Sequence, residues 1–284
     1  MENPLISAQA LAALLLDKSA DVLVCDNRFD LVDPAAGARA YAQGHIPGAV
    51  HTDLDHALCS ARTGKNGRHP LPTREAFAHT MAQLGVNANT RVVAYDANNS
   101  TYAARLWWMM RWIGHANVSV LDGGLQAWTD AGNPLSTDKP AARKTGNLQV
   151  RPALTKTVDY AQVLDNIGTA ARMVVDARSP DRFRGENETL DPVGGHIPDA
   201  RNRFFKDNLN PSNHFKPAGQ LHSEFETLLA GRKAEDVINQ CGSGVSACHN
   251  LLAMHIAGLD GSALYPGSWS EWCAQPGAPV ARGA

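Results

Sequence analysis

The sequence predicts an α/β protein with two similar domains, each built on a parallel sheet flanked by helices. Short runs rich in valine and other apolar residues alternate with helical stretches along the chain, a pattern typical of parallel sheets covered on both faces. Four segments of the first half recur in the same order in the second half. The 284 residues also give each half enough chain for a core of its own.

The first half begins with an Ala- and Leu-rich helix expected from Ala8 to Leu16. Thr73 is expected to cap a later helix that ends at Gly85. A third helix carries Trp107, Trp108 and Trp112, whose spacing indicates a packing role rather than chemistry. The strands expected in this half cover residues 22–26, 91–95 and 118–121.

The second half repeats these signals after a stretch rich in Pro, Thr, Lys and Ala that is typical of a linker. Four matching pairs carry the repeat: 23–28 with 173–178, 44–49 with 195–200, 92–96 with 237–241, and 122–128 with 266–272. We therefore expect a first domain over residues 1–136, a linker over 137–149 and a second domain over 150–284.

The composition is ordinary, with 44% hydrophobic residues, 19% charged residues and a formal net charge of -2. Neither nucleic acid nor a membrane is expected as a partner. The N-terminus has no basic start followed by an apolar run, so a cytoplasmic location is expected. The five cysteines are irregularly spaced, which argues against a disulfide framework or a metal site. No cofactor is expected.

Cys241 stands out because it follows a predicted buried strand and precedes a helix that runs to Gly258. Two glycines, Gly242 and Gly244, let the intervening loop curl so that backbone N–H groups point inward. Together with the positive end of the helix dipole, these groups favour the thiolate, which is the nucleophilic form of cysteine. The first half has Asp96 at the matching position, so the fold itself does not require a cysteine there.

These features resemble the rhodanese superfamily, specifically its tandem-domain sulfurtransferases, over nearly the whole chain. The loop from Cys241 to Ala247 is similar to the Cys-Gly-Ser-Gly-Val-Thr-Ala pattern of 3-mercaptopyruvate sulfurtransferases, with Ser246 in place of threonine. The resemblance implies that Cys241 takes a sulfane sulfur from a small-molecule donor and passes it, as a persulfide, to a thiol or cyanide. Gly242, Gly244, Val245, Ser246 and Ala247 would then line the substrate site.

The resemblance also assigns roles outside the loop. Arg182 matches an arginine that holds the donor carboxylate, and a second arginine is expected nine residues later, where this chain has Asp191. His45 and Asp33 match, more loosely, the histidine and aspartate of a relay that ends at Ser243. His45 also belongs to a Gly-His-Ile-Pro turn that recurs at His196, which equally suits a structural role. Among thiol acceptors, the family analogy suggests thioredoxin.

The sequence alone leaves three alternative functions to consider. Thiosulfate-using relatives share the persulfide mechanism but tend to carry Arg-Lys at the positions of Gly242 and Ser243. A cysteine-dependent phosphatase would need an arginine six residues after the cysteine, where this chain has Ala247. A non-catalytic rhodanese-like module would be expected to have lost the cysteine, as the first half has at Asp96.

Overall fold

A computed structural model describes residues 3–169 and 171–283, which form two compact units. The first unit consists of residues up to Ser60, Pro72–Leu154 and Ser212–His214. The second consists of Ala61–Leu71, Thr155–Pro211 and residues from Phe215 onward. Each unit therefore includes a short segment from the other half of the sequence, and residues 61–71, expected in the first domain, pack in the second unit.

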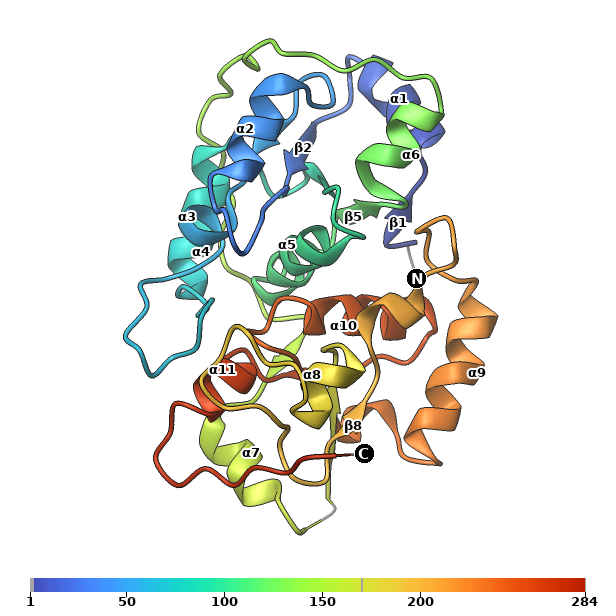
Figure 1. Cartoon of the computed structure of the whole chain (residues 1–284). Helices are drawn as coiled ribbons and strands as arrows, with labels where there is room; N and C mark the ends of the chain where they lie inside the picture. The colour runs from blue at the N-terminus through green and yellow to red at the C-terminus, as the bar shows by residue number, and fades with distance from the viewer. Residues whose placement is uncertain (1–2, 170, 284) are drawn as a thin grey trace. The chain divides into compact units, whose positions relative to one another are not determined.

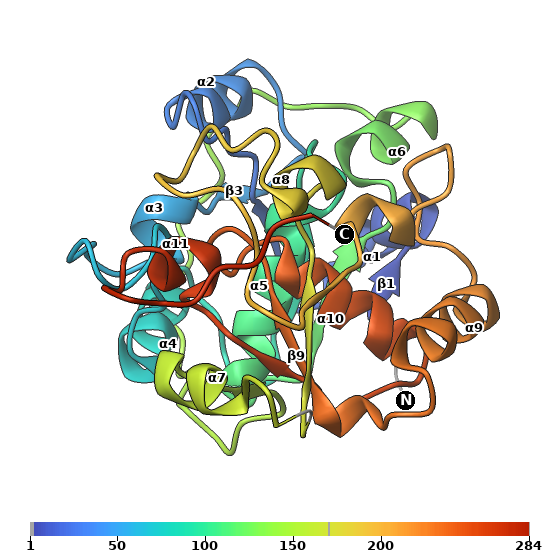
Figure 2. The same cartoon turned by 60° about the horizontal axis from the view of Figure 1, so that its bottom comes forward.

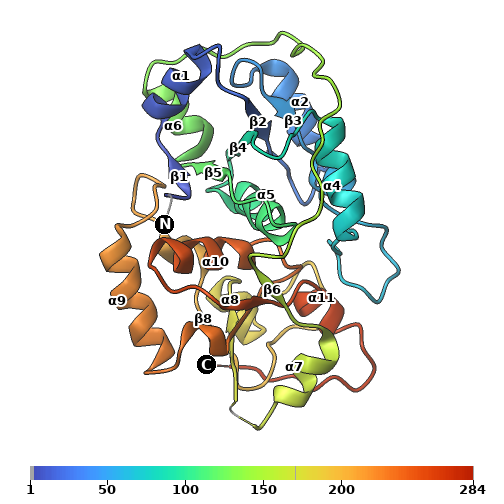
Figure 3. The ribbon, with the colours of Figure 1, turned by 180° about the vertical axis from the view of Figure 1, so that it is seen from behind.

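The first unit is built on a five-stranded parallel sheet, as the alternating pattern predicted. Its strand order, β1-β5-β4-β2-β3, is visible in Figure 3. The central pair is in register from Val22 opposite Arg91 to Asp26 opposite Tyr95. The strands are β1 (Leu5–Ile6), β2 (Val22–Asp26), β3 (Val50–His51), β4 (Arg91–Tyr95) and β5 (Val118–Leu121).

The second unit repeats the arrangement with the order β6-β10-β9-β7-β8, again all parallel. The predicted duplication is therefore present at the level of sheet topology. Its strands are β6 (Lys156–Thr157), β7 (Met173–Asp176), β8 (Arg201–Asn202), β9 (Val237–Gln240) and β10 (Ala263–Leu264).

Figure 1 shows the helices of the first unit, and side chains cap the starts of two of the longer ones. The Ser7 side chain accepts the N–H of Ala10 at the start of α1, and Thr73 accepts that of Ala76 at the start of α4, as expected. The helices are α1 (Ala8–Leu16), α2 (Ala36–Gln43), α3 (Leu54–Ala57), α4 (Arg74–Gln83), α5 (Thr101–Trp112) and α6 (Gly124–Asp130).

In the second unit, α10 packs against β9 and beside α9 (Figure 2). All residues of β9 and most of α10 are buried, so the segment between them is held on both sides by the core. The helices are α7 (Tyr160–Asn166), α8 (Pro180–Arg184), α9 (Ala218–Leu229), α10 (Ala247–Ile256) and α11 (Ser268–Trp272), with 3-10 turns at Phe205–Asn208 and Ala234–Asp236.

The stretch predicted as a linker has no helix or strand over residues 137–149, but it is not loose. The N–H of Gly146 donates to the carbonyl of Ala82, and that of Leu148 donates to Val86. Arg143 also pairs with Asp21. The stretch therefore lies along the first unit, which extends to Leu154.

Candidate active site

Cys241 lies at the carboxyl end of β9, in the loop that leads into α10. Its side chain is buried, and both of its backbone groups are bonded. The Cys241 N–H donates to the Ser268 hydroxyl over 3.1 Å, and its carbonyl accepts the N–H of Trp269 over 2.9 Å. The start of α11 thus fixes the backbone of the candidate nucleophile.

The loop after Cys241 requires glycine at position 244. Gly244 has φ of +75°, and a Cβ there would lie 2.3 Å from the carbonyl oxygen of Pro266. Beyond it, the carbonyls of Val245 and Ser246 accept the N–H groups of Cys248 and His249, which turns the chain into the helix. Ala247 is the first residue of α10. The predicted loop residues therefore form one tight turn around Cys241.

Asp96 shows what this kind of loop does in the first unit. Its carboxyl oxygens accept four backbone N–H groups, from Asn98, Ser100, Tyr102 and Ala103, over 2.7–2.9 Å. Its own carbonyl accepts a backbone N–H from the start of α6, the same bond that fixes Cys241 in the second unit. A loop of this geometry directs several N–H groups at its first side chain. Burial raises the pKa of Asp96, and these four N–H groups act against that increase by stabilising the charged form.

Ser243 has a histidine partner that the sequence did not reveal. Nδ1 of His69 lies 2.7 Å from the Ser243 hydroxyl oxygen, and both side chains are buried. His69 belongs to the segment 61–71, which is far from the loop in sequence but packs within the second unit. The serine two residues after the candidate nucleophile is therefore in contact with a group that can exchange protons.

His45, predicted as that partner, has a different environment. Its ring stacks on Tyr41 at 4.0 Å between centroids, and its two nitrogens lie 2.9 and 3.1 Å from the carbonyls of Tyr41 and Asp138. His196 repeats this in the second unit, with its ring 3.8 Å from Phe183 and Nδ1 2.9 Å from that residue's carbonyl. A contact present in both copies of the repeat is a structural feature of the turn.

Asp33, predicted as the third member of the relay, forms an ion pair with Arg39 on the surface of the first unit. This pairing lowers the pKa of Asp33. The structure thus connects Ser243 to His69, and it gives His45 and Asp33 other partners within the first unit.

Arg182 lies beside the loop, and it is not the only arginine there. A Cβ on Gly242 would lie 3.6 Å from both Nη atoms of Arg182 and 3.2 Å from Nη2 of Arg68. Arg68 directly precedes His69 in the segment 61–71. Two guanidinium groups therefore border the residue that follows Cys241.

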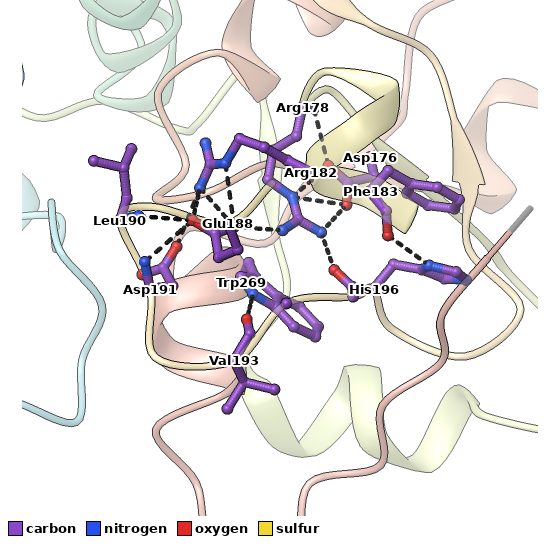
Figure 4. A network of polar contacts seen from close by, with 12 residues as sticks. Asp176, Arg178, Arg182, Phe183, Glu188, Leu190, Asp191, Val193, His196 and Trp269 are labelled. Atoms are coloured by element: carbon purple, nitrogen blue, oxygen red, sulfur yellow. Dashed lines mark hydrogen bonds and ion pairs between the residues drawn. The ribbon is translucent and has the colours of Figure 1, made fainter. Parts of the chain in front are cut away.

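Both arginines belong to a network of carboxylates and cations in the second unit, and Figure 4 shows the part of it around Arg182. Arg182 binds Glu188 at 2.8 Å and Asp191 at 3.3 Å. Burial acts to raise the pKa of Glu188, but Arg182 and the backbone N–H groups of Leu190 and Asp191 outweigh it and keep that pKa below its usual range. These contacts fix Arg182 in a rigid position beside the loop.

Arg178 lies deeper in the same network. It binds Asp176 at 2.6 Å and the carbonyl of Gly195 at 2.7 Å. In the first unit, Arg28 makes the same bonds to Asp26 at 2.6 Å and to Gly44 at 2.7 Å. Arg178 is therefore a repeated framework residue.

The described residues contain no group of three or more His, Cys, Asp or Glu side chains arranged to hold a metal ion. Nor does any helix in the described part of the chain have the length and apolar character needed to cross a membrane. Burial raises the pKa of Cys25 to about 12 and that of Cys273 to about 11, so neither thiol ionises appreciably at neutral pH.

Cys248, the other cysteine near the site, has a packing role. It lies on α10, fully buried, with its thiol donating to the Gly244 carbonyl over 3.3 Å. Replacing Cys248 with alanine should lower the free energy of unfolding by about 1–2 kcal/mol, because it leaves a small cavity. Catalytic activity should be retained, which urea unfolding and a turnover assay on the same preparation would check.

The fold and the loop together define a rhodanese-like protein. The rhodanese-like domain family matches residues 7–131 and 159–275, so the match covers both units. The chain belongs to this family.

Within this family, the chain is similar to several named sulfurtransferases. The chain is 44% identical over 281 residues to a probable 3-mercaptopyruvate sulfurtransferase of Pseudomonas aeruginosa, covering 98% of each chain. It is 37% identical to SseB of Mycobacterium tuberculosis, a putative thiosulfate sulfurtransferase, covering 98% of this chain and 97% of the relative. Among solved structures, the 3-mercaptopyruvate enzyme SseA of Escherichia coli aligns with a TM-score of 0.79 at 30% identity, covering 94% of this chain and 99% of SseA.

Proposed function

We propose that the protein is a sulfurtransferase that uses 3-mercaptopyruvate as sulfur donor. The Cys241 thiolate attacks the donor sulfur, and the carbon–sulfur bond breaks with its electron pair passing to carbon. The resulting enolate takes up a proton and leaves as pyruvate, while Cys241 keeps the sulfur as a persulfide. A thiolate acceptor or cyanide then attacks the outer sulfur and releases the Cys241 thiolate.

The position of Cys241 carries this proposal. It lies at the first position of a loop whose counterpart in the first unit directs four N–H groups at one side chain. Such a loop favours both the attacking thiolate and the persulfide anion without reorganising during the reaction. The relatives named for 3-mercaptopyruvate support the choice of donor.

His69 takes the proton-transfer role in place of His45. With 3-mercaptopyruvate, the leaving enolate needs a proton, which the Ser243 hydroxyl can deliver and His69 can replace, since the two side chains are 2.7 Å apart. Thiosulfate releases sulfite, which needs no proton in order to leave. His69 should therefore matter more for one donor than for the other.

The change His69→Asn should lower kcat for 3-mercaptopyruvate by about a hundredfold, the usual size of general acid catalysis. The rate with thiosulfate should fall less than tenfold, and steady-state kinetics with both donors would measure the contrast. His45→Asn is the matched control. It should lower the melting temperature, because the His45 ring nitrogens lie within hydrogen-bond distance of the carbonyls of Tyr41 and Asp138, and it should leave the ratio of the two rates unchanged. An equal loss for both donors in His69→Asn would contradict the assignment.

Thiosulfate is the second candidate donor, and one observation favours it. Arg68 and Arg182 both border Gly242, so two guanidinium groups lie beside the residue that follows the nucleophile, although the loop itself supplies no cation. The named relative SseB fits the same reading. A comparison of kcat/KM for 3-mercaptopyruvate and thiosulfate on one preparation decides between them. A higher value for 3-mercaptopyruvate is expected, and a higher value for thiosulfate would replace the first proposal with the second.

We further propose thioredoxin or another small thiol as the acceptor, with cyanide as a laboratory substitute, and the cytoplasm as the location. Reducing conditions there maintain both free cysteines and thiol acceptors.

A further inference from the structure

We propose that Arg68 is the second anion-binding residue of the donor site, and that Asp191 sets the net charge of the site and thereby its preference among donors. The inference rests on the proposed function and extends it. Arg68 would hold the donor's carboxylate together with Arg182, doing the work of the arginine that the resemblance led us to expect at position 191.

The first observation that supports a binding role for Arg68 is that its guanidinium group lies close to Gly242. Its Nη2 atom would lie 3.2 Å from a Cβ on Gly242, closer than either Nη atom of Arg182 at 3.6 Å. Gly242 directly follows the nucleophile, so an anion bound by both guanidinium groups would lie next to the Cys241 sulfur. The Nε–H of Arg68 is buried without a hydrogen-bond partner among the described residues. This N–H donor has no acceptor in the described part of the free protein and can therefore serve a ligand.

Arg68 is also held rigidly, which a binding residue needs. Its backbone N–H donates to the Ser270 hydroxyl over 2.9 Å. The preceding residue, Gly67, has φ of +81°, and a Cβ there would lie 2.7 Å from the carbonyl oxygen of Gly267. The following residue is His69, bound to Ser243. Consecutive residues of one fixed segment thus contact consecutive residues of the catalytic loop.

Asp191 shows that the two arginines can share one carboxylate. Its oxygens lie 2.7 Å from Nη1 of Arg68 and 3.3 Å from Nη2 of Arg182, and its side chain is only 4% exposed. The bond to Arg68 is the shorter one. A carboxylate from within the chain therefore already uses the geometry that a donor carboxylate would need.

The net charge of the ionic network bears on which donor the site prefers. The ionic network contains three cations and three carboxylates, so its formal net charge is zero: Arg68, Arg178, Arg182, Asp176, Glu188 and Asp191. A neutral network attracts a dianion less than a network with spare positive charge does. 3-Mercaptopyruvate carries one carboxylate and thiosulfate carries two charges. Asp191 therefore disfavours thiosulfate relative to 3-mercaptopyruvate.

The first test removes the proposed contact. Arg68→Gln should raise KM for 3-mercaptopyruvate by about ten- to a hundredfold, the usual effect of losing a charge-assisted hydrogen bond. Because the chemistry itself is untouched, kcat should change less than threefold. Arg68→Lys, which keeps the charge and loses the planar fork, should be intermediate. Arg184→Gln is the control, since Arg184 pairs with Glu186 at the surface and should leave KM unchanged.

The second test separates binding from structural pairing. Arg68→Gln alone leaves Asp191 buried with one fewer cation, and the double change with Asp191→Asn removes that imbalance. If Arg68 binds the donor, the double variant keeps the high KM although its melting temperature recovers. A double variant with the KM of the unmodified protein would overturn the proposal, because Arg68 would then be only a counterion for Asp191.

Asp191→Asn tests the charge argument. It should raise kcat/KM for thiosulfate relative to 3-mercaptopyruvate by at least about fivefold, since it gives the network one net positive charge. An unchanged or lower ratio would refute the role of Asp191. The proposed function is judged separately, by whether unmodified protein gains a sulfur on Cys241. If Cys241 gains a sulfur but the Arg68 variants keep an unchanged KM, as Arg184→Gln should, the proposed function stands and only the inference about Arg68 fails.

Discussion

Replacing Cys241 with serine is expected to abolish sulfur transfer, lowering turnover by about a thousandfold or more. A serine hydroxyl stays protonated at neutral pH and cannot carry a sulfane sulfur as a persulfide. Its smaller oxygen fits the same buried position, whose backbone is fixed by Ser268 and Trp269. The melting temperature should therefore change by only a few degrees. Turnover with 3-mercaptopyruvate and cyanide, measured beside a melting curve, checks both expectations.

Cys248→Ala is the matched control for this experiment, since both cysteines are buried and belong to the same loop-and-helix segment. Loss of activity in the Cys241 variant alone supports the assignment. Turnover above about a tenth of the unmodified rate in Cys241→Ser would mean that another group carries the sulfur.

Replacing Arg182 with alanine is expected to raise KM for 3-mercaptopyruvate by about thirty- to a thousandfold, or about 2–4 kcal/mol. The guanidinium group stands beside Gly242, where the donor carboxylate would lie, and it is fixed there by Glu188. Its removal takes away two parallel hydrogen bonds and a charge at once. Steady-state kinetics with 3-mercaptopyruvate would show the change in KM.

Arg184→Ala is the control, because Arg184 lies on the same helix and pairs only with Glu186 among the ion pairs of the described residues. Glu188 loses a partner in Arg182→Ala and keeps Arg178 at 3.4 Å, so a modest loss of stability is expected as well. An unchanged KM in Arg182→Ala would place the carboxylate on Arg68 alone.

The sheets and most of the helices could be predicted because their signals are local. Apolar runs specified the strands 22–26 and 91–95 with the bounds that the structure gives them. Caps marked helix starts, as Thr73 did for α4. The internal repeat then supplied the order of the elements, because each pattern of the first half had a counterpart in the second.

His69 and Arg68 could not be predicted in this way, because their partners are distant in sequence. His69 contacts a serine 174 residues away, and Arg68 an aspartate 123 residues away. One signal was available: the spacing from His69 to His214 equals that from Asp96 to Cys241. In the first unit, His214 lies 3.3 Å from Asp122, at the turn before α6. A repeat alignment extended through these loops would have drawn attention to the histidine pair.

The expectation about charge near the sulfur was incomplete for the same reason. Judged from the loop alone, Gly242 and Ser243 supply no cation. The structure supplies two from other segments, with Arg68 and Arg182 both next to Gly242. Their carboxylate partners return the network to neutrality, which keeps the argument for a monoanionic donor. The charge of a site is a property of its whole surroundings and cannot be read from one loop.

The most direct test of a persulfide on Cys241 is the mass of the protein after incubation with 3-mercaptopyruvate in the absence of an acceptor. The intact chain should gain about 32 daltons, the mass of one sulfur atom, and peptide mapping should place the gain on Cys241. Adding cyanide should remove it. An unmodified mass, or the same gain in Cys241→Ser, would contradict the account.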